Sequence, residues 1–359
     1  MTNLTRQQRD RVGRALIAAY SRALRPLLFR AYGGDPEKIH ELTIKVLGRI
    51  GVTPLKDVIA ALVPAACQPV EVAGVHFPGR VGLAAGVDKD GLAAPCWSAF
   101  GFGFAELGTV TAAAQPGNPT PRLYRLKRSQ ALINRMGFNN RGAQALAERL
   151  GVWGVERGNQ ALDLTIGISL GKTKVTPLDQ AIEDYRTSLK AVAPRADYIA
   201  LNVSSPNTPG LRRLQDGRTL TDLLTALVAE APDLPLFVKL SPDLTSAQLD
   251  ATVEAAERGG ARGLIATNTT LRRGGLVFPE TGWAFQAGGL SGAPLQRRAL
   301  AVVGQVVRST TLPVIGSGGV MTPDDAHALF DAGAQLVQVC TGFIFSGPGL
   351  VTRINALDL

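Results

Sequence analysis

The sequence has few cysteines, histidines and aromatic residues, and each shortage argues against a class of site. The three cysteines, Cys67, Cys96 and Cys340, lack C-x-x-C spacing, so neither a disulfide framework nor a zinc site is indicated. The three histidines form no H-x-x-x-H pair, so no metal site is expected. Aromatic residues make up only 6% of the chain and the basic residues are not in blocks, which disfavours a nucleic-acid groove.

Long apolar runs are also missing. No run approaches the roughly 18 residues that a membrane-spanning helix needs. The N-terminus is basic, but its apolar run at 15–20 is short and is followed by more arginine, so it makes a poor signal peptide. The absence of a disulfide framework fits a reduced, cytosol-facing protein. The net charge of +9 suits an anionic ligand, an anionic membrane surface or nucleic acid.

The first 66 residues have a helical pattern. Apolar residues recur there at helical spacing: Val12, Leu16, Ala19 and Ala23. Pro26 is expected to interrupt this pattern, and Asp35 is expected to cap a further helix that begins at Pro36. A basic amphipathic segment of this kind either packs on its own domain, the commoner outcome, or lies on a membrane surface.

The rest of the chain alternates between strand and helix patterns. Residues 70–81 are predicted to form a hairpin that turns at Pro78-Gly79. Strand-like runs follow at 82–87, 104–110, 164–170, 198–203, 236–240, 263–267, 313–316 and 336–339. Helical patterns lie between most of them, including 177–193, 219–231, 246–259, 294–308 and 323–332. Eight alternating strands predict an α/β fold, a closed (β/α)₈ TIM barrel over 67–359 with an N-terminal helical extension over 1–66. No G-x-G-x-x-G follows the first strand, which argues against a dinucleotide-binding open sheet.

Polar side chains gather where these strands end, which is where a barrel of this type carries its chemistry. The run 198–210 begins as a buried strand and ends in Asn202, Ser204, Ser205, Asn207 and Thr208. A capped turn would explain such a run taken alone. Because buried polar groups are costly unless they are satisfied, the cluster also indicates a bound polar ligand.

Two lysines and a glycine-rich turn extend this interpretation. Lys89 and Lys239 end apolar strands, where an ammonium is costly without an anionic partner, although either could reach solvent. The run Gly316-Ser-Gly-Gly319 follows the seventh strand and suits a phosphate cradle, or equally an ordinary tight turn. Asparagines at 134, 202, 207 and 268 suit a planar imide or ureide that bears a carboxylate. With no histidine or carboxylate pair among these ends, cofactor chemistry is better supported than hydrolysis.

A series of motifs in this order resembles one known family. The motifs are Ala84-Ala-Gly-Val-Asp-Lys-Asp-Gly91, Gly108-Thr-Val-Thr111, Asn134-Arg-Met-Gly-Phe-Asn-Asn140, Asn202-Val-Ser-Ser-Pro-Asn-Thr-Pro-Gly210, Ala266-Thr-Asn-Thr-Thr270, Gly288-Gly-Leu-Ser-Gly292 and Gly316-Ser-Gly-Gly319. They are similar in order and spacing to those of the dihydroorotate dehydrogenases, from about Pro26 to the C-terminus. Serine at 205, where class 1 enzymes use cysteine, and the helical extension resemble class 2, the membrane-associated, quinone-reducing branch.

The resemblance implies FMN at the barrel mouth, oxidation of dihydroorotate to orotate in pyrimidine biosynthesis, and electron transfer to a membrane quinone. It implies that Ser205 is the base and that Thr208 and Phe138 shape its proton relay. The implied substrate contacts are Lys89, Asn134, Arg135, Met136, Gly137, Phe138, Asn202, Asn207, Asn268 and Thr269. The implied cofactor contacts are Ala85, Gly86, Val87, Asp88, Lys89, Thr109, Ser169, Asn202, Lys239, Thr267, Gly292, Gly319, Cys340 and Thr341. His40 and Arg125 fall on positions that line the quinone tunnel. The implied location is peripheral, on the cytoplasmic face of the cell membrane or on the mitochondrial inner membrane.

Two residues depart from the family pattern. Ser169 stands where asparagine usually contacts FMN, and Cys340 stands where a tyrosine usually borders the quinone end, so the phenol is missing there. Three alternatives remain: the same half-reaction with a soluble acceptor such as fumarate or NAD, a flavin enzyme acting on tRNA, and a non-catalytic barrel that binds a phosphate ligand. Serine at 205 and the N-terminal helices argue against the first, and the second would need an RNA-binding tail. The oligomeric state and the quinone are left open.

Overall fold

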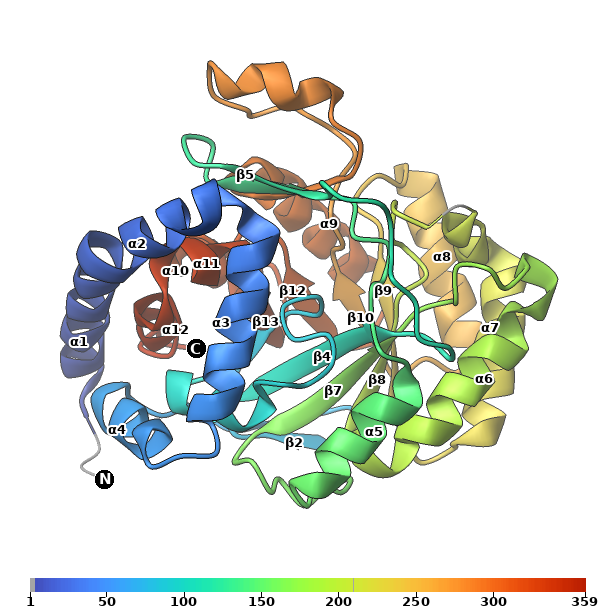
Figure 1. The fold of residues 1–359 in the computed structure, drawn as a ribbon. Helices are drawn as coiled ribbons and strands as arrows, with labels where there is room; N and C mark the ends of the chain where they lie inside the picture. The colour runs from blue at the N-terminus through green and yellow to red at the C-terminus, as the bar shows by residue number, and fades with distance from the viewer. Residues whose placement is uncertain (1–3, 209) are drawn as a thin grey trace.

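Eight parallel strands close into a barrel in the computed structural model, which describes residues 4–208 and 210–359 (Figure 1). The strands are β3 (Val81–Leu83), β4 (Phe104–Val110), β7 (Thr165–Leu170), β8 (Tyr198–Leu201), β9 (Leu236–Leu240), β10 (Gly263–Ala266), β12 (Val314–Ser317) and β13 (Leu336–Val339). β13 pairs with β3 and completes the circle. The predicted barrel is therefore confirmed, and each of the eight predicted strand runs overlaps a barrel strand.

Helices surround the barrel and bury their apolar faces against it. They are α5 (Ala143–Val152), α6 (Ala181–Val192), α7 (Gly217–Glu230), α8 (Ser246–Arg258), α9 (Gln296–Ser309), α10 (Pro323–Asp331), α11 (Thr341–Ser346) and α12 (Pro348–Ile354). In α7 the buried residues Leu220, Leu223, Leu224 and Leu227 recur at helical spacing and join the main core. α8 and α10 each begin with a capping box, built on Thr245 and Thr322.

A hairpin closes the amino-terminal end of the barrel. β1 (Val70–Val72) pairs with β2 (Val75–Phe77), and Phe77 packs on Phe104 and Tyr198 inside the barrel. The prediction of a turn at Pro78-Gly79 is wrong, because the chain turns at Ala73-Gly74. Both turn residues have positive φ (52° and 76°), as a two-residue turn that matches the strand twist requires.

The N-terminal helices are α1 (Arg6–Ala19), a π-helical turn (Tyr20–Leu24), α2 (Arg25–Arg30), a short 3₁₀ segment (Ala31–Gly34), α3 (Pro36–Ile50) and α4 (Leu55–Leu62). Pro26 does not interrupt the helical path: it lies in α2, which follows the π-helical turn directly, and the backbone stays helical from α1 into α2. Asp35 caps α3 as predicted, and its carboxylate accepts hydrogen bonds from the amides of Glu37 and Lys38. The division at residue 66 stays a prediction, and residues 1–3 of the extension lie outside the described residues.

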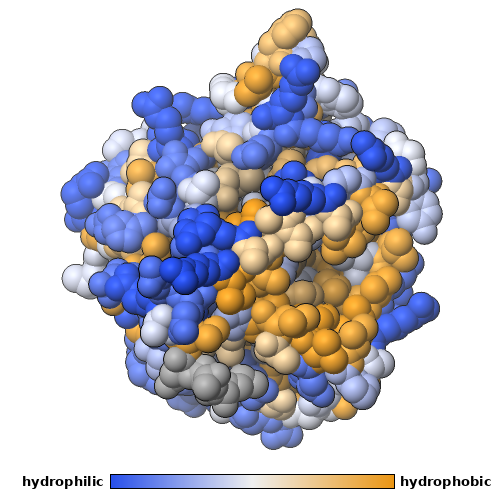
Figure 2. Space-filling model, turned by 90° about the vertical axis from the view of Figure 1, so that its left-hand side faces the viewer, coloured by the Kyte–Doolittle hydropathy of each residue, from blue (hydrophilic) through white to orange (hydrophobic). Residues whose placement is uncertain are grey.

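Apolar side chains lie exposed on the face that these helices form. Leu24, Leu27 and Leu62 are 50%, 68% and 65% exposed. Figure 2 shows apolar side chains gathered around a hollow on this face. Among the described residues, no helix combines the length and apolar character that crossing a membrane demands.

A three-stranded antiparallel sheet lies outside the barrel. It consists of β5 (Leu123–Leu126), β6 (Ala131–Asn134) and β11 (Gly289–Gly292), with β6 in the centre. These three short strands were not predicted from the sequence. They matter for the site because β6 and β11 end at Asn134 and Gly292, two of the expected ligand-binding residues.

Candidate active site

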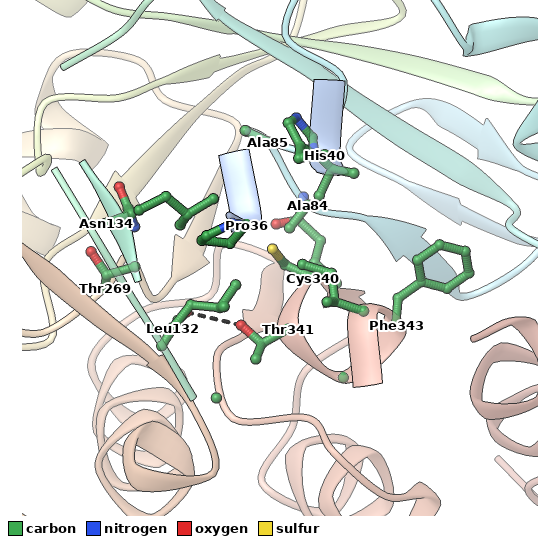
Figure 3. A pocket seen from close by; sticks show the side chains of 18 of the residues that line it. Pro36, His40, Ala84, Ala85, Leu132, Asn134, Thr269, Cys340, Thr341 and Phe343 are labelled. Carbon is green, nitrogen blue, oxygen red and sulfur yellow. Dashed lines mark hydrogen bonds between the residues drawn. The ribbon is translucent and has the colours of Figure 1, made fainter. Parts of the chain in front are cut away.

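A cavity of about 620 Å³ lies between the carboxyl ends of the barrel strands and the N-terminal helices. This is a volume typical of sites for cofactors and small molecules. Its barrel half is polar, and the half formed by α1, α2 and α3 is apolar. In Figure 3, Asn134 and Thr269 lie on one side of the cavity, while Ala84, Cys340 and Phe343 lie on the other.

Most of the residues that the sequence analysis selected line this one cavity. These are Ser205, Phe138, Lys89, Asn134, Met136, Gly137, Asn202, Asn207, Asn268, Thr269, Ala85, Gly86, Val87, Thr109, Lys239, Thr267, Gly292, Gly319, Cys340, Thr341, His40 and Arg125. Residues far apart in the sequence therefore meet at one mouth of the barrel. Their individual roles stay predictions.

Four selected residues do not line the cavity. Thr208 is buried and its Oγ1 has no hydrogen-bond partner among the described residues. Arg135 points away and binds the carbonyl of Pro121. Asp88 accepts bonds from the amide of Ala93 and the indole of Trp97, and its burial raises its pKa to about 6.

The fourth is Ser169, which lies behind the wall. Its hydroxyl forms a 2.9 Å hydrogen bond with Thr109 Oγ1. Thr109 also accepts a bond from the side-chain amide of Asn202 at 3.0 Å. Ser169 is wholly buried and does not itself line the cavity. Its hydroxyl instead holds Thr109, which in turn binds Asn202, and both of these residues line the cavity.

The asparagines form a connected wall. Asn268 Nδ2 donates to Asn202 Oδ1 and to Ser204 Oγ, both at 3.0 Å. Asn207 Nδ2 donates to the side-chain and backbone oxygens of Asn134, both at 3.1 Å. Their amides are fixed in orientation by these bonds, so they can present donors and acceptors to a planar ligand at little entropic cost.

Ser205 lies at the cavity wall and is 6% exposed. Its Oγ accepts a hydrogen bond from the backbone amide of Asn207 at 3.3 Å. Since the hydroxyl hydrogen is not used in that contact, it is free to interact with a ligand. No histidine or carboxylate makes a hydrogen bond to this hydroxyl within the part of the chain that the structure describes.

Lys89 also lines the cavity and lies among groups of both charges. Burial lowers the pKa of Lys89, and the nearby carboxylate of Glu37 opposes that shift. Burial, reinforced by the charge of Lys89, lowers the pKa of His40 to about 3, so His40 is neutral at physiological pH. Glu37 is itself paired with Arg122 at 2.8 Å.

Lys239 enters from β9 and forms a buried ion pair. Its Nζ lies 3.0 Å from Glu106 Oε1, and the two side chains are 6% and 0% exposed. Gln338, also on the wall, donates to the other oxygen of Glu106 at 2.6 Å. A buried charge pair of this kind is stable only when further hydrogen bonds satisfy it. The sequence analysis did not identify Glu106 or Gln338, because neither stands just past the end of its strand.

Glycines let the backbone approach the cavity closely. Gly318 and Gly319 have φ values of 117° and 74°, and a Cβ on Gly319 would lie 2.2 Å from Cα of Gln296. Nearby, Ser291 Oγ and Thr341 Oγ1 are 2.9 Å apart. Backbone amides and hydroxyls at such a turn suit a phosphate group. The Oε1 of Gln338 is buried without a hydrogen-bond partner among the described residues, which also fits a polar occupant.

Of the residues in the apolar half of the cavity, only His40 and Arg125 were predicted from the sequence as site residues. It is lined by Leu16, Ala19, Tyr20, Leu24, Leu28, Phe29, Pro36, Ile39, Thr43, Ile44 and Leu47. Arg125 Cζ lies 4.0 Å from the centroid of the Phe29 ring, and burial lowers the pKa of Arg125. Cys340 also lines the cavity, and its burial raises its thiol pKa. Helical periodicity marked these helices as amphipathic, but it could not distinguish a cavity wall from a core face.

Comparisons with known proteins agree with this geometry. Residues 68–357 match the family model described as Dihydroorotate dehydrogenase. A relative named Dihydroorotate dehydrogenase (quinone) from Salinispora arenicola is 51% identical, with 94% of this chain and 98% of the relative covered. One with the same name from Chloroflexus aurantiacus is 48% identical, over 94% of this chain and 95% of the relative. The crystal structure of DHODH from Eimeria tenella in complex with ferulenol is similar with a TM-score of 0.80 and 32% identity, over 92% of this chain and 93% of that one.

Proposed function

The chain belongs to the dihydroorotate dehydrogenase family, and on that premise we propose that it oxidises dihydroorotate to orotate with a quinone as electron acceptor. The reaction belongs to pyrimidine biosynthesis, and enzymes of this family depend on a flavin. The observation that carries the proposal is the single cavity, in which a polar half with the asparagines and Ser205 continues into an apolar half between helices.

The flavin is FMN in this proposal, because the glycine turn at Gly318-Gly319 suits one phosphate and no dinucleotide motif follows β3. The turn, together with Ser291 and Thr341, would hold the phosphate. Ala85, Gly86 and Thr109 would line the ring system. When bound, the flavin supplies a two-electron acceptor for the hydride that leaves the substrate.

The substrate would lie against the asparagine wall. Asn134, Asn202, Asn207 and Asn268 would bind its amide groups, and Lys89 would pair with its carboxylate. Ser205 would remove a proton from the ring carbon next to the one that loses the hydride. A serine hydroxyl is a weak base in water, so its proton must move away as the hydride leaves. Thr208, whose buried hydroxyl has no hydrogen-bond partner among the described residues, and Phe138 would shape that route.

The apolar half would receive the quinone. His40 and Arg125 offer the polar contacts for a quinone head group within otherwise apolar walls, and Phe29 holds Arg125 in position. The exposed leucines of α2 and α4 and the basic N-terminal residues would bind the chain peripherally to the membrane that holds the quinone, on its cytoplasmic face in a bacterium. We assign this role to residues 1–66 and catalysis to residues 67–359.

The visible spectrum of the purified protein tests the proposal directly. A bound flavin gives a yellow protein, and dihydroorotate added without air should bleach it. A short-chain quinone should then restore the colour, whereas fumarate or NAD should not. A colourless protein, or a colour that dihydroorotate leaves unchanged, would contradict the proposal. Recovery with fumarate or NAD instead of the quinone would favour the soluble-acceptor alternative.

A further inference from the structure

The inner wall of the cavity rests on a charged group that does not itself reach the cavity. Glu106 lies in the middle of β4 and is fully buried. One carboxylate oxygen lies 3.0 Å from the ammonium of Lys239. The other accepts a hydrogen bond from Gln338 at 2.6 Å, and the Tyr198 hydroxyl lies 3.5 Å from it. Three barrel strands thus converge on one carboxylate.

This arrangement fixes the position of Lys239 and pairs its ammonium with a buried carboxylate. Lys239 lines the cavity, and its ammonium is paired with the carboxylate of Glu106, which lies behind the cavity wall. An ammonium that is 6% exposed would be costly without that anion. Burial and the charge of Glu106 raise the pKa of Tyr198 well above its usual value, so the tyrosine remains a neutral neighbour and does not compete as an anion.

We propose that Glu106 is a positioning residue that keeps Lys239 charged at the flavin whether the flavin is oxidised or reduced. The inference rests on the proposed function, because it needs a flavin in the cavity beside Lys239. When the flavin gains two electrons, negative charge develops near a cation that is already in place, and no proton has to be delivered to Lys239. This is preorganised electrostatic stabilisation, with Glu106 acting through the lysine and not touching the flavin.

The variant E106Q removes the anion and keeps the shape. Its Lys239 has no buried counter-ion while the flavin is oxidised, so the side chain should be neutral there and take up a proton when the flavin becomes reduced. Flavin reduction in E106Q should therefore consume one more proton than in the parent. Relative to the parent, the equilibrium constant for flavin reduction should change by a further factor of about ten per pH unit, which corresponds to about 30 mV per pH unit for a two-electron couple.

The measurement is the equilibrium between the flavin and a redox dye of known potential, with dithionite as reductant, at several pH values. Y198F is the matched control, since it alters the same buried layer but leaves the charge pair, and it should match the parent. K239M and the double variant E106Q/K239M should both lack the additional proton. An E106Q protein with the parent's pH dependence would overturn the inference.

A folding failure of E106Q does not prevent the test. In that case the thermal midpoints of K239M and E106Q/K239M decide, because K239M leaves the Glu106 carboxylate unpaired and the double variant removes both charges. If Glu106 and Lys239 depend on each other, the thermal midpoint of E106Q/K239M should equal or exceed that of K239M. A lower midpoint for the double variant would overturn the inference. A parent protein without flavin, or one that dihydroorotate does not bleach, would instead contradict the proposed function.

Discussion

The guanidinium of Arg125 lies over the ring of Phe29, with 4.0 Å between Cζ and the ring centroid. Arg125 belongs to β5 and Phe29 to α2, so this contact joins the sheet outside the barrel to the N-terminal helices. Because both residues line the apolar half of the cavity, the position of the cation there depends on the aromatic ring.

Phe29→Leu removes the ring and keeps an apolar side chain. A cation–π contact of a partly buried arginine contributes about 1–2 kcal/mol, so we expect KM for a short-chain quinone to rise about 5- to 30-fold. Flavin reduction by dihydroorotate should not change. Stopped-flow measurement of the two half-reactions separates the effects. Val152 at the end of α5 is exposed and does not line the cavity, so Val152→Ala provides the control. Equal loss in both half-reactions of Phe29→Leu would contradict the assignment.

Asn207→Ala removes the two hydrogen bonds to Asn134 and one amide of the substrate wall. Leaving polar groups of the partly buried substrate wall without partners costs about 1.5–3 kcal/mol, so KM for dihydroorotate should rise about 10- to 100-fold. KM for the quinone should stay close to that of the parent. Asn159 also donates a side-chain hydrogen bond, to Gly154, but lies away from the cavity. Asn159→Ala should therefore leave both constants unchanged, and a normal KM in Asn207→Ala would remove the substrate role.

Ser205→Ala should retain the flavin and lose its reduction by dihydroorotate, by at least about 100-fold. The reason is that no other base makes a hydrogen bond to this hydroxyl in the described part of the chain. Ser205→Cys places a more acidic group there, so its rate should rise with pH toward the ordinary thiol pKa of about 8.5. Anaerobic rapid mixing at several pH values measures both. Undiminished bleaching in Ser205→Ala would exclude Ser205 as the base.

The barrel and much of the polar site could be predicted because their signals are local. Buried parallel strands are continuous apolar runs, and their carboxyl ends are marked by residues that cannot extend a sheet, such as Asn202 and Gly319. These local signals do not distinguish a polar residue that binds its neighbours from one that faces the cavity. Ser169 and Asp88 stand near strand ends like the residues of the cavity wall, but their hydroxyl and carboxylate turn to Thr109 and to Trp97.

The remaining features depend on tertiary contacts that a short pattern does not record. β6 takes its register from β5 and β11, and β11 lies more than 150 residues further along the chain, so its four residues give little signal of their own. Glu106 is one polar residue inside an apolar strand, and only the approach of Lys239 and Gln338 explains it. The apolar cavity half requires α1, α2 and α3 to be placed against the barrel.

The pH dependence of substrate use should report Lys89. Burial lowers the pKa of Lys89, so the cation that binds the substrate carboxylate is lost at a lower pH than for an ordinary lysine. We expect kcat/KM for dihydroorotate to fall tenfold per pH unit on an alkaline limb below about 10.4, the ordinary lysine value. Lys89→Arg should lower activity but abolish this limb, because a guanidinium stays charged. A limb that persists in Lys89→Arg would assign it to another group.

The packing of α1 on α12 predicts the effect of a larger residue at Gly349. A Cβ there would lie 2.4 Å from the carbonyl oxygen of Gly13 and 2.7 Å from the amide of Ile17, and backbone atoms cannot move aside. Gly349→Val should therefore destabilise the protein by about 1–3 kcal/mol, seen as a lower thermal midpoint. Gly304 in α9 is the matched control, because a Cβ there meets only the end of Arg308 at 3.4 Å.

Gly304→Ala should leave the thermal midpoint unchanged or raise it, since alanine stabilises a helix by up to about 1 kcal/mol relative to glycine. Gly349→Val should also lower the rate with quinone more than the rate of flavin reduction, because α1 carries Leu16 and Ala19 of the apolar cavity wall. Thermal unfolding and the two half-reaction rates test this together. A thermal midpoint of Gly349→Val equal to that of the parent would mean that α1 can separate from α12 without loss of stability. That result would contradict the role of this contact in holding the apolar cavity wall.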